Sequence, residues 1–477
     1  MLFSQLDFWI FFAAVFALYL LLPFRLQNLM LLVASYVFYG AWDWRFLGLI
    51  AFSTMVDYLV GLKMGLSEDP RRRKHLLMIS MAMNLGLLGV FKYLNFFIGS
   101  FAALSESVGL PASIPVLNIV LPVGISFYTF QTMSYTIDIY RRELKPAPRF
   151  LDFALFVAFF PQLVAGPIER AKNLLPEIMA PRTVTWDGVS RGIVLCLIGL
   201  IKKVVIADAI SPMVDTVYGM EDPSGGAIVV ATWLFAIQIY CDFSGYTDIA
   251  RGVAKMLGFG LMRNFAQPYF ATNPQEFWRR WHISLSTWLR DYLYISLGGN
   301  RHGKKRTQVN LMATMVLGGL WHGAAWNFVL WGLYQGGLLV THRQFFGRRK
   351  GSGEGARRGM LHWVGRIGLI ALYFQVTCYG WLLFRAQSWQ QVADFTARLT
   401  TLRLSDFSAL PIGAVPAPAI AGLLLLFAWD VATEASGKVR FYAAWPTPLR
   451  AALWAVLIYA LAFGATTTSG AFIYFQF

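Results

Sequence analysis

Charged residues are scarce in this 477-residue chain. Asp, Glu, Lys and Arg make up 14% of it, whereas soluble domains contain about 25%. Hydrophobic residues reach 57%, which excludes an ordinary soluble domain and predicts a membrane protein. Acidic residues are the scarcer sign, with 25 Asp and Glu against 41 Lys and Arg. Because the basic residues form short runs between apolar segments, they predict cytoplasmic loops and argue against a nucleic-acid partner.

Cysteine is also rare, and the usual metal signatures are missing. Cys196, Cys241 and Cys378 lie in or beside apolar stretches without any C-x-x-C pair, so we expect buried thiols. H-E-x-x-H is absent, and we expect no metal ion. The N-terminus lacks a basic n-region and an A-x-A site, and Arg25 follows the first apolar run. This pattern predicts a first membrane span rather than a cleaved signal, with the N-terminus outside.

Long apolar segments predict an all-α polytopic membrane protein, because about 20 apolar residues cross a bilayer as a helix. The expected spans are residues 7–24, 26–42, 45–64, 76–104, 117–139, 187–210, 226–247, 367–385, 413–430 and 449–467. With the N-terminus outside, the basic loops fall in the cytoplasm and both termini are extracytoplasmic.

Two further apolar stretches do not fit single spans. FFPQLVAGPIER (159–170) contains Pro161, Gly166 and Pro167, which interrupt a helix. The stretch 309–341 has basic clusters on both sides, so we expect it to enter the membrane and return. Irregular backbone at membrane depth is tolerated only inside protein or beside a watery cavity.

His322 lies near the middle of the second stretch, within LWHGAAWNFVLWG (320–332). An imidazole in apolar surroundings costs free energy unless it is satisfied or used, so it marks a candidate functional position. We expect Trp326 to wall a cavity there, and Asn327 to bind a carbonyl or orient a ring. Close packing between helices is the structural alternative for the neighbouring glycines, but it does not explain the histidine.

A second polar and aromatic stretch covers residues 273–306. Trp281, Trp288 and Tyr292 share one side at helical spacing, which predicts an interfacial helix on the cytoplasmic leaflet. His282 in this stretch is either a satisfied core residue or a general base, since an imidazole titrates near neutral pH. The basic residues here either attract a phosphorylated donor or are solvated surface: Arg279, Arg280, Lys304, Lys305 and Arg306.

Asp242 is a candidate functional carboxylate within an apolar span. It belongs to QIYCDFSGYTDIARG (238–252), at the end of the span 226–247. Carboxylates within a membrane are functional candidates by default. We expect Asp242 to orient a histidine or pair with an arginine. The alternative is that it makes a structural hydrogen bond.

Five stretches together resemble the membrane-bound O-acyltransferase family, and most of all its alginate O-acetyltransferase branch. They are LPVGISFYTFQTMSYTIDIYR (121–141), FFPQLVAGPIER (159–170), QIYCDFSGYTDIARG (238–252), WHISLSTWLRDYLYISLGGN (281–300) and LWHGAAWNFVLWG (320–332). The resemblance implies one domain of about ten to twelve transmembrane helices, with re-entrant and interfacial helices around a central tunnel. Within it we expect N-terminal helices at 1–115, a catalytic core at 116–345 and C-terminal helices at 360–477 with an extracytoplasmic tail.

The resemblance also implies an activity. The family's near-universal histidine falls on His322, the expected base, and its second polar position falls on His282. An acetyl group is expected to pass from cytoplasmic acetyl-CoA through the tunnel of an inner-membrane protein, surrounded by membrane lipids. An extracytoplasmic partner of the SGNH type would then place it on a polysaccharide such as alginate. The residues expected to line the substrate path are Asn327, Trp326, Trp321, Asp242 and Ser284.

The sequence ends SGAFIYFQF, an aromatic-rich segment. We predict that Tyr474 carries the acyl group transiently or docks the partner, since a phenol can serve as a nucleophile. Its aromatic neighbours Phe472, Phe475 and Phe477 are expected to support this role. An interfacial aromatic anchor is the alternative.

The sequence is also compatible with other functions. The acceptor can be peptidoglycan, cellulose, teichoic acid or a lipid-linked sugar. A proton-coupled transporter or flippase can use the two histidines as proton relays, and a non-catalytic scaffold needs neither. No internal repeat is evident in the sequence, which weakens the transporter interpretation.

Overall fold

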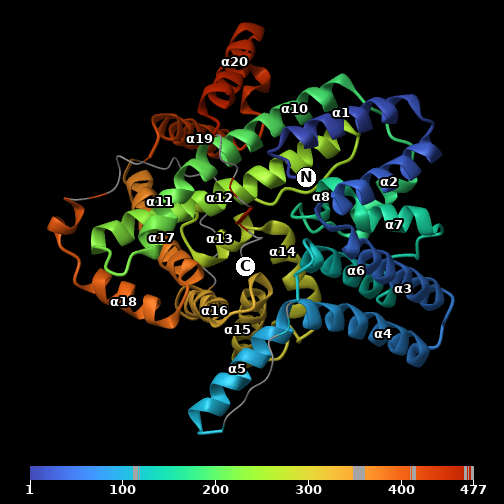
Figure 1. Ribbon diagram of the computed structural model, residues 1–477, viewed down its shortest axis with the longest axis horizontal. Coiled ribbons are helices and arrows are strands. Elements are labelled where there is room, and N and C mark those ends of the chain that lie inside the picture. Colours follow the sequence, from blue (N-terminus) through green and yellow to red (C-terminus); the bar gives the residue numbers. More distant parts are fainter. Residues whose placement is uncertain are drawn as a thin grey trace. The chain divides into compact units, whose positions relative to one another are not determined.

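The computed structural model describes residues 1–110, 117, 119–347, 360–408, 410, 415–466, 470 and 472–473. Every regular element in these ranges is a helix, as the composition predicts (Figure 1). The chain forms two compact units. Unit 1 comprises Met1–Leu195 and Ala250–Met262, and unit 2 comprises Cys196–Ile249 and Arg263–Phe477.

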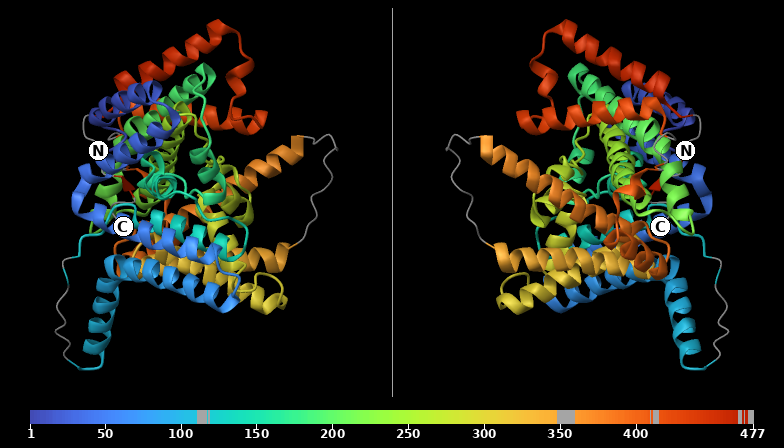
Figure 2. Two further views of the ribbon diagram at one scale, coloured as in Figure 1. Left: turned by 90° about the vertical axis from the view of Figure 1, so that its right-hand side faces the viewer. Right: turned by 90° about the vertical axis from the view of Figure 1, so that its left-hand side faces the viewer.

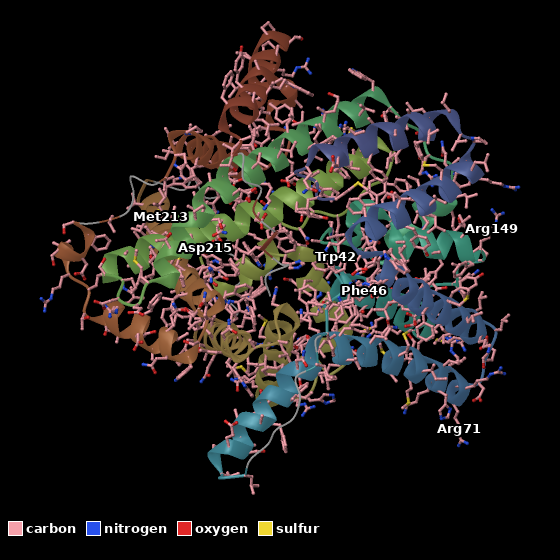
Figure 3. All side chains as sticks on the ribbon, viewed as in Figure 1. Trp42, Phe46, Arg71, Arg149, Met213 and Asp215 are labelled. Carbon is pink, nitrogen blue, oxygen red and sulfur yellow. The ribbon has the colours of Figure 1, made fainter. Side chains whose placement is uncertain are left out.

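Unit 1 contains the N-terminal helices. They are α1 (Leu6–Leu21), α2 (Phe24–Asp43), η1 (Trp44–Phe46), α3 (Leu47–Gly65), α4 (Pro70–Leu88), the π-helix η2 (Gly89–Tyr93), α5 (Leu94–Ser107), α6 (Ile125–Tyr140), α7 (Phe150–Ala158), α8 (Phe160–Leu163), α9 (Ala171–Met179) and most of α10 (Trp186–Leu200). The rings of Trp42 and Phe46, labelled in Figure 3, stack 5.5 Å apart where α2 meets η1.

A buried polar network joins α3, α4 and α6. The carboxylate of Asp57 accepts hydrogen bonds from the Ser80 hydroxyl at 2.6 Å and the Asn84 amide at 2.8 Å. Thr132 on α6 donates to the Asn84 carbonyl at 3.1 Å. Such mutual satisfaction allows polar side chains to pack between apolar helices. It also explains why α6 is rich in hydroxyl residues although nearly all of it is buried.

The stretch 159–170 is interrupted as predicted. Pro161 lies at the start of the four-residue helix α8, and non-helical chain leads from it to α9. All of these residues are buried, so the irregular backbone is surrounded by protein. Glu169 accepts the Met262 N–H at 2.5 Å and thereby ties the segment to the loop after α12.

Unit 2 contains the candidate site. Its elements are the end of α10, the π-helix η3 (Ile201–Ala207), α11 (Asp208–Gly219), α12 (Gly225–Met256) up to Ile249, η4 (Pro268–Phe270), α13 (Pro274–Arg280), α14 (Ile283–Trp288), the π-helix η5 (Leu289–Tyr294), α15 (Gly303–His322), α16 (Trp326–Phe346), α17 (Met360–Arg385), α18 (Trp389–Thr400), η6 (Leu404–Phe407), α19 (Ala417–Ser436), η8 (Phe441–Ala444) and α20 (Thr447–Gly464). Arg385 at the end of α17 pairs at 2.7 Å with Asp215 on α11, labelled in Figure 3.

Several helices have the length and apolar character of membrane spans. Within the described ranges there are six such stretches: Phe24–Gly65, Pro70–Ser107, Gly225–Met256, Trp363–Arg385, Ala417–Ser436 and Thr447–Gly464. The first has 42 residues and includes the predicted spans 26–42 and 45–64. The predicted span 117–139 instead coincides with the shorter helix α6, whereas the predicted span 187–210 lies within the continuous helix formed by α10, η3 and α11. The total number of crossings remains a prediction.

The stretch 309–341 forms a helical hairpin, and its entry into and return from the membrane remains a prediction. Helices α15 and α16 are joined by three residues and lie side by side (Figure 1 and Figure 2). Glycines make this close approach possible: a Cβ on Gly332 would lie 2.6 Å from the carbonyl oxygen of Met315, and one on Gly319 would collide with that of Phe328. The packing interpretation is therefore correct for Gly319, and Gly332 on α16 has the same role.

Candidate active site

His282 lies at a break between two helices. Helix α13 ends at Arg280, α14 begins at Ile283, and His282 has a left-handed backbone with φ of +42°. A non-glycine residue in this region is uncommon and needs support from its surroundings. The continuous interfacial helix predicted over this stretch is therefore wrong. Trp281 precedes the break, whereas Trp288 and Tyr292 follow it, and all three side chains are buried in unit 2.

Asn264 supports the break from the opposite chain segment. Its carbonyl oxygen accepts the Ile283 N–H at 2.9 Å, and its side-chain oxygen accepts the Ser284 N–H at 3.0 Å. These bonds occupy N–H groups at the start of α14 that have no partner within the helix. The Ser284 hydroxyl lies 3.5 Å from the His282 Nδ1 atom. Ser284, predicted to line the substrate path, is thus placed beside the histidine.

The two histidines come together although 40 positions separate them. Their ring centroids are 6.3 Å apart, and both side chains are buried. His322 is the last residue of α15, which packs against η5 just after α14. The ring of Trp321 contacts both, with centroid distances of 6.0 Å to His282 and 5.1 Å to His322. The structure therefore brings the predicted base, its predicted partner and Trp321, a residue predicted to line the substrate path, into one cluster.

Aromatic rings surround His322. Trp331 and Phe384 pack edge-on against its imidazole at 5.2 and 5.6 Å. Trp326, predicted to wall this place, is 64% exposed and lies outside the buried cluster. It is the first residue of α16, whereas Trp331 lies on the part of that helix that faces α15. Sequence reasoning missed Trp331 and Phe384, since one apolar ring among many carries no individual signal.

Asn327 has a structural role that differs from its prediction. Its amide nitrogen donates to the carbonyl oxygens of Phe384 at 3.2 Å and Ala386 at 3.1 Å. The final carbonyls of a helix lack partners within it, so this amide caps the end of α17. Because both amide hydrogens are used, Asn327 is not arranged to bind a substrate carbonyl.

We expect Asn327→Ala to destabilise the protein by about 1–3 kcal/mol, because two helix-end carbonyls lose their donor. The turnover number per folded molecule should stay close to that of the unchanged protein. Thermal unfolding in detergent, together with turnover per folded molecule, checks both expectations. A large loss of turnover at unchanged stability would instead restore a role in binding the substrate.

Within the part of the chain that the structure describes, Asp242 pairs with a lysine rather than with a histidine or an arginine. Its Oδ1 atom lies 2.9 Å from the Nζ atom of Lys203, and its Oδ2 atom accepts the Ile473 N–H at 2.6 Å. Lys203 on η3 also contacts Asp208 at 2.7 Å. Of the two alternatives raised by the sequence, the structural one describes this geometry. Lys203 was missed, although a lysine inside the apolar stretch 187–210 was a signal of a buried partner.

The predicted donor-attracting residues divide into two groups. Arg280 is held between Glu276 at 2.8 Å and Glu434 at 2.7 Å, so its charge is already neutralised. The prediction for Arg280 is therefore wrong. The sequence did not reveal this pairing, because Glu434 lies 154 positions from Arg280. Arg279, Lys304, Lys305 and Arg306 are exposed.

The aromatic end of the sequence is described only in part. Phe472 is buried against Phe243 and Tyr246, with ring centroids 6.0 and 4.8 Å apart. A side chain buried in this way does not provide a docking surface, so that role of Phe472 is corrected. The predictions for Tyr474, Phe475 and Phe477 lie outside the described residues.

Burial determines the protonation state of His282. The side chain is inaccessible to solvent, which lowers its pKa to about 3, so the ring is neutral near pH 7. In the unfolded chain a histidine has a pKa of about 6.5. Between these values the unfolded state binds more protons than the folded state, and stability therefore falls as the pH falls.

We expect acidification from pH 7.5 to pH 5 to cost the folded protein about 2 kcal/mol through His282. His282→Asn should lessen this loss, since asparagine tolerates the left-handed backbone and does not titrate. The melting temperature of both proteins in detergent, measured at the two pH values, checks the difference. Equal losses in the two proteins would contradict the assignment.

A family model for the membrane-bound O-acyltransferase family matches residues 46–380. The chain belongs to this family. It is a multi-pass membrane acyltransferase. It is 41% identical over 449 residues to the probable alginate O-acetylase AlgI of Azotobacter vinelandii, covering 93% of this chain and 86% of that protein. The protein of the same name from Pseudomonas aeruginosa is 40% identical, covering 90% and 81%. The peptidoglycan O-acetyltransferase of Helicobacter pylori is 34% identical, covering 76% and 71%.

Proposed function

We propose that this acyltransferase takes an acetyl group from cytoplasmic acetyl-CoA and passes it across the inner membrane for O-acetylation of an extracytoplasmic polysaccharide such as alginate. The proximity of His282 and His322, at 6.3 Å in an aromatic cluster, is the observation that carries the proposal. The names of the relatives from Azotobacter and Pseudomonas support alginate as the acceptor.

His322 is the proposed general base. A thioester is already activated, so the enzyme needs to hold it against a hydroxyl and remove one proton. The hydroxyl oxygen attacks the thioester carbon, its proton passes to the imidazole of His322, and the C–S bond breaks. The proton then passes to the departing thiolate. His282 is neutral near pH 7 and can donate a hydrogen bond to the oxyanion that develops on the carbonyl.

The surroundings favour transfer over hydrolysis. The rings of Trp321, Trp331 and Phe384 exclude water from the neighbourhood of His322. The exposed basic residues Arg279, Lys304 and Lys305 are proposed to attract the phosphate groups of the donor. The donor enters from the cytoplasm in this scheme, and a central tunnel among about ten to twelve crossings conducts the acetyl group.

An extracytoplasmic partner of the SGNH type is proposed to complete the transfer to the polysaccharide. Both chain termini face outward in this arrangement, and Tyr474 relays the acetyl group or docks the partner. Peptidoglycan is the second candidate acceptor, because the relative from Helicobacter pylori bears that name.

Purified protein in lipid vesicles with acetyl-labelled acetyl-CoA tests the proposed function. We expect release of free CoA, and transfer of the label to an added partner and polysaccharide. Vesicles without protein are the control. Movement of a labelled substrate across the vesicle membrane without thioester cleavage would identify a transporter instead. Supplying alginate and peptidoglycan fragments in parallel decides between the acceptors.

A further inference from the structure

Gly470, Phe472 and Ile473, which we call the terminal segment, are held inside unit 2 by a buried ionic cluster. We call this cluster the clamp: Lys203, Asp208 and Asp242. The Lys203 ammonium contacts both carboxylates, and all three side chains are almost inaccessible to solvent. Lys203 also donates to the Gly470 carbonyl at 3.1 Å, while Asp242 accepts the Ile473 N–H at 2.6 Å. The clamp therefore makes hydrogen bonds to the backbone of Gly470 and of Ile473.

Stability alone does not account for such a cluster. Removing charges from water costs several kcal/mol each, and well-packed apolar side chains of similar volume often serve stability equally well. The clamp also has two carboxylates for one ammonium. The clamp instead defines the position of the bound backbone, because each of its charged groups has partners in fixed directions. Its members come from three elements, η3, α11 and α12, and all of them converge on Gly470 and Ile473.

The π-helix η3 gives Lys203 its direction. The wider turn of a π-helix displaces side chains from the α-helical register. The adjacent Lys202 contacts Asp248 at 2.8 Å, whereas Lys203 contacts Asp242, which lies six residues earlier on α12. Val204 in the same π-helix accepts the Thr466 N–H at 3.2 Å and guides the chain toward the clamp.

The clamped segment reaches the histidines through two rings. Phe472 lies between the clamped residues Gly470 and Ile473, and its ring packs against Phe243. The Phe243 ring in turn packs edge-on against His282, with centroids 4.7 Å apart. A shift of the segment therefore moves the ring that borders His282.

We propose that Lys203 and Asp242 are positioning residues of this acyltransferase, which hold Gly470, Phe472 and Ile473 as a wall of the active centre. The inference rests on the proposed function. The wall keeps Phe243 against His282 and water out of the reaction.

Gly470→Ala tests the clamp without altering any charge. A Cβ there would lie 2.9 Å from the Asp208 Oδ1 atom, which Lys203 holds in place, so the segment must shift. We expect acetyl transfer to fall on the order of tenfold or more, with a larger share of acetyl-CoA hydrolysed to acetate. Gly219→Ala on α11 is the matched control, because nothing lies within 4 Å of its added Cβ.

Asp242→Asn is the second variant. Its amide oxygen can still accept the Ile473 N–H, but the ion pair with Lys203 is lost. We expect the same shift from transfer toward hydrolysis as in Gly470→Ala. A merely structural role would lower transfer and hydrolysis together, in proportion to the amount of folded protein. The ratio of the two products is therefore the decisive measurement.

A labelling experiment reports on the segment independently of activity. Ile473 is 2% exposed and the three natural cysteines are buried, so Ile473→Cys should resist a maleimide in the folded protein. Adding Gly470→Ala should make it reactive. Unchanged product ratios in both clamp variants would overturn the proposal, as would failure of both variants to fold. Absence of any acetyl transfer by the unchanged protein would refute the proposed function, while the labelling would still show whether the clamp holds the segment.

Discussion

His322→Ala is expected to lower acetyl transfer by about 10²- to 10⁴-fold, the usual contribution of a positioned general base. The methyl group cannot accept the hydroxyl proton, and neutral His282 lies too far from its ring position to replace it directly. Binding of acetyl-CoA should change little, since the imidazole acts on the hydroxyl rather than on the nucleotide. Turnover and the KM for acetyl-CoA, measured on purified protein in vesicles, separate these two effects.

His75→Ala is the matched control for that experiment. His75 lies on the exposed side of α4, so the same substitution there should leave both parameters unchanged. The alanine at position 322 also leaves a space beside Trp331 and Phe384, and thermal unfolding must therefore show that the variant is folded. Full activity of folded His322→Ala would refute the base and favour a scaffold whose partner performs the chemistry.

Gly319→Ala is expected to have the second-largest effect. The added methyl group would collide with the carbonyl oxygen of Phe328 and approach Gly332 within 3.1 Å. Overpacking of this kind costs about 1–3 kcal/mol. Because His322 lies one turn further along α15, separating the two helices also moves the imidazole. A displacement of about 1 Å can lower the rate of reaction by about 10²-fold.

Gly337→Ala provides the control for the hairpin. It lies on α16, and nothing is within 4 Å of an added Cβ there. Because alanine favours a helix more than glycine does, stability should be unchanged or slightly higher. The melting temperature and the turnover of the two variants are compared under the same conditions. Normal turnover of Gly319→Ala would mean that the hairpin spacing does not control the position of His322.

The helical architecture and the two histidines were predictable from the sequence. Apolar segments identify helices because the bilayer requires internal satisfaction of every backbone group. A histidine in such a segment is conspicuous, since it carries a cost. The prolines in the stretch 159–170 also indicated where a helix is interrupted.

The break at His282 was not predictable from the same rules. Aromatic residues at helical spacing suggested one helix, and the left-handed residue is a histidine rather than a glycine. What stabilises it is Asn264, a partner in a different segment. Pairings of this kind depend on the tertiary fold. The same holds for Arg280 with Glu434 and for Asp242 with Lys203, whose partners are far away in the sequence.

The position of His322 on its helix has an electrostatic consequence. It is the last residue of the 20-residue helix α15, and the peptide dipoles of a helix add up to about half a negative charge at that end. When the imidazole takes a proton from the attacking hydroxyl, the resulting cation faces this partial charge. The peptide backbone itself thus offsets part of the cost of creating a positive ion in an apolar interior.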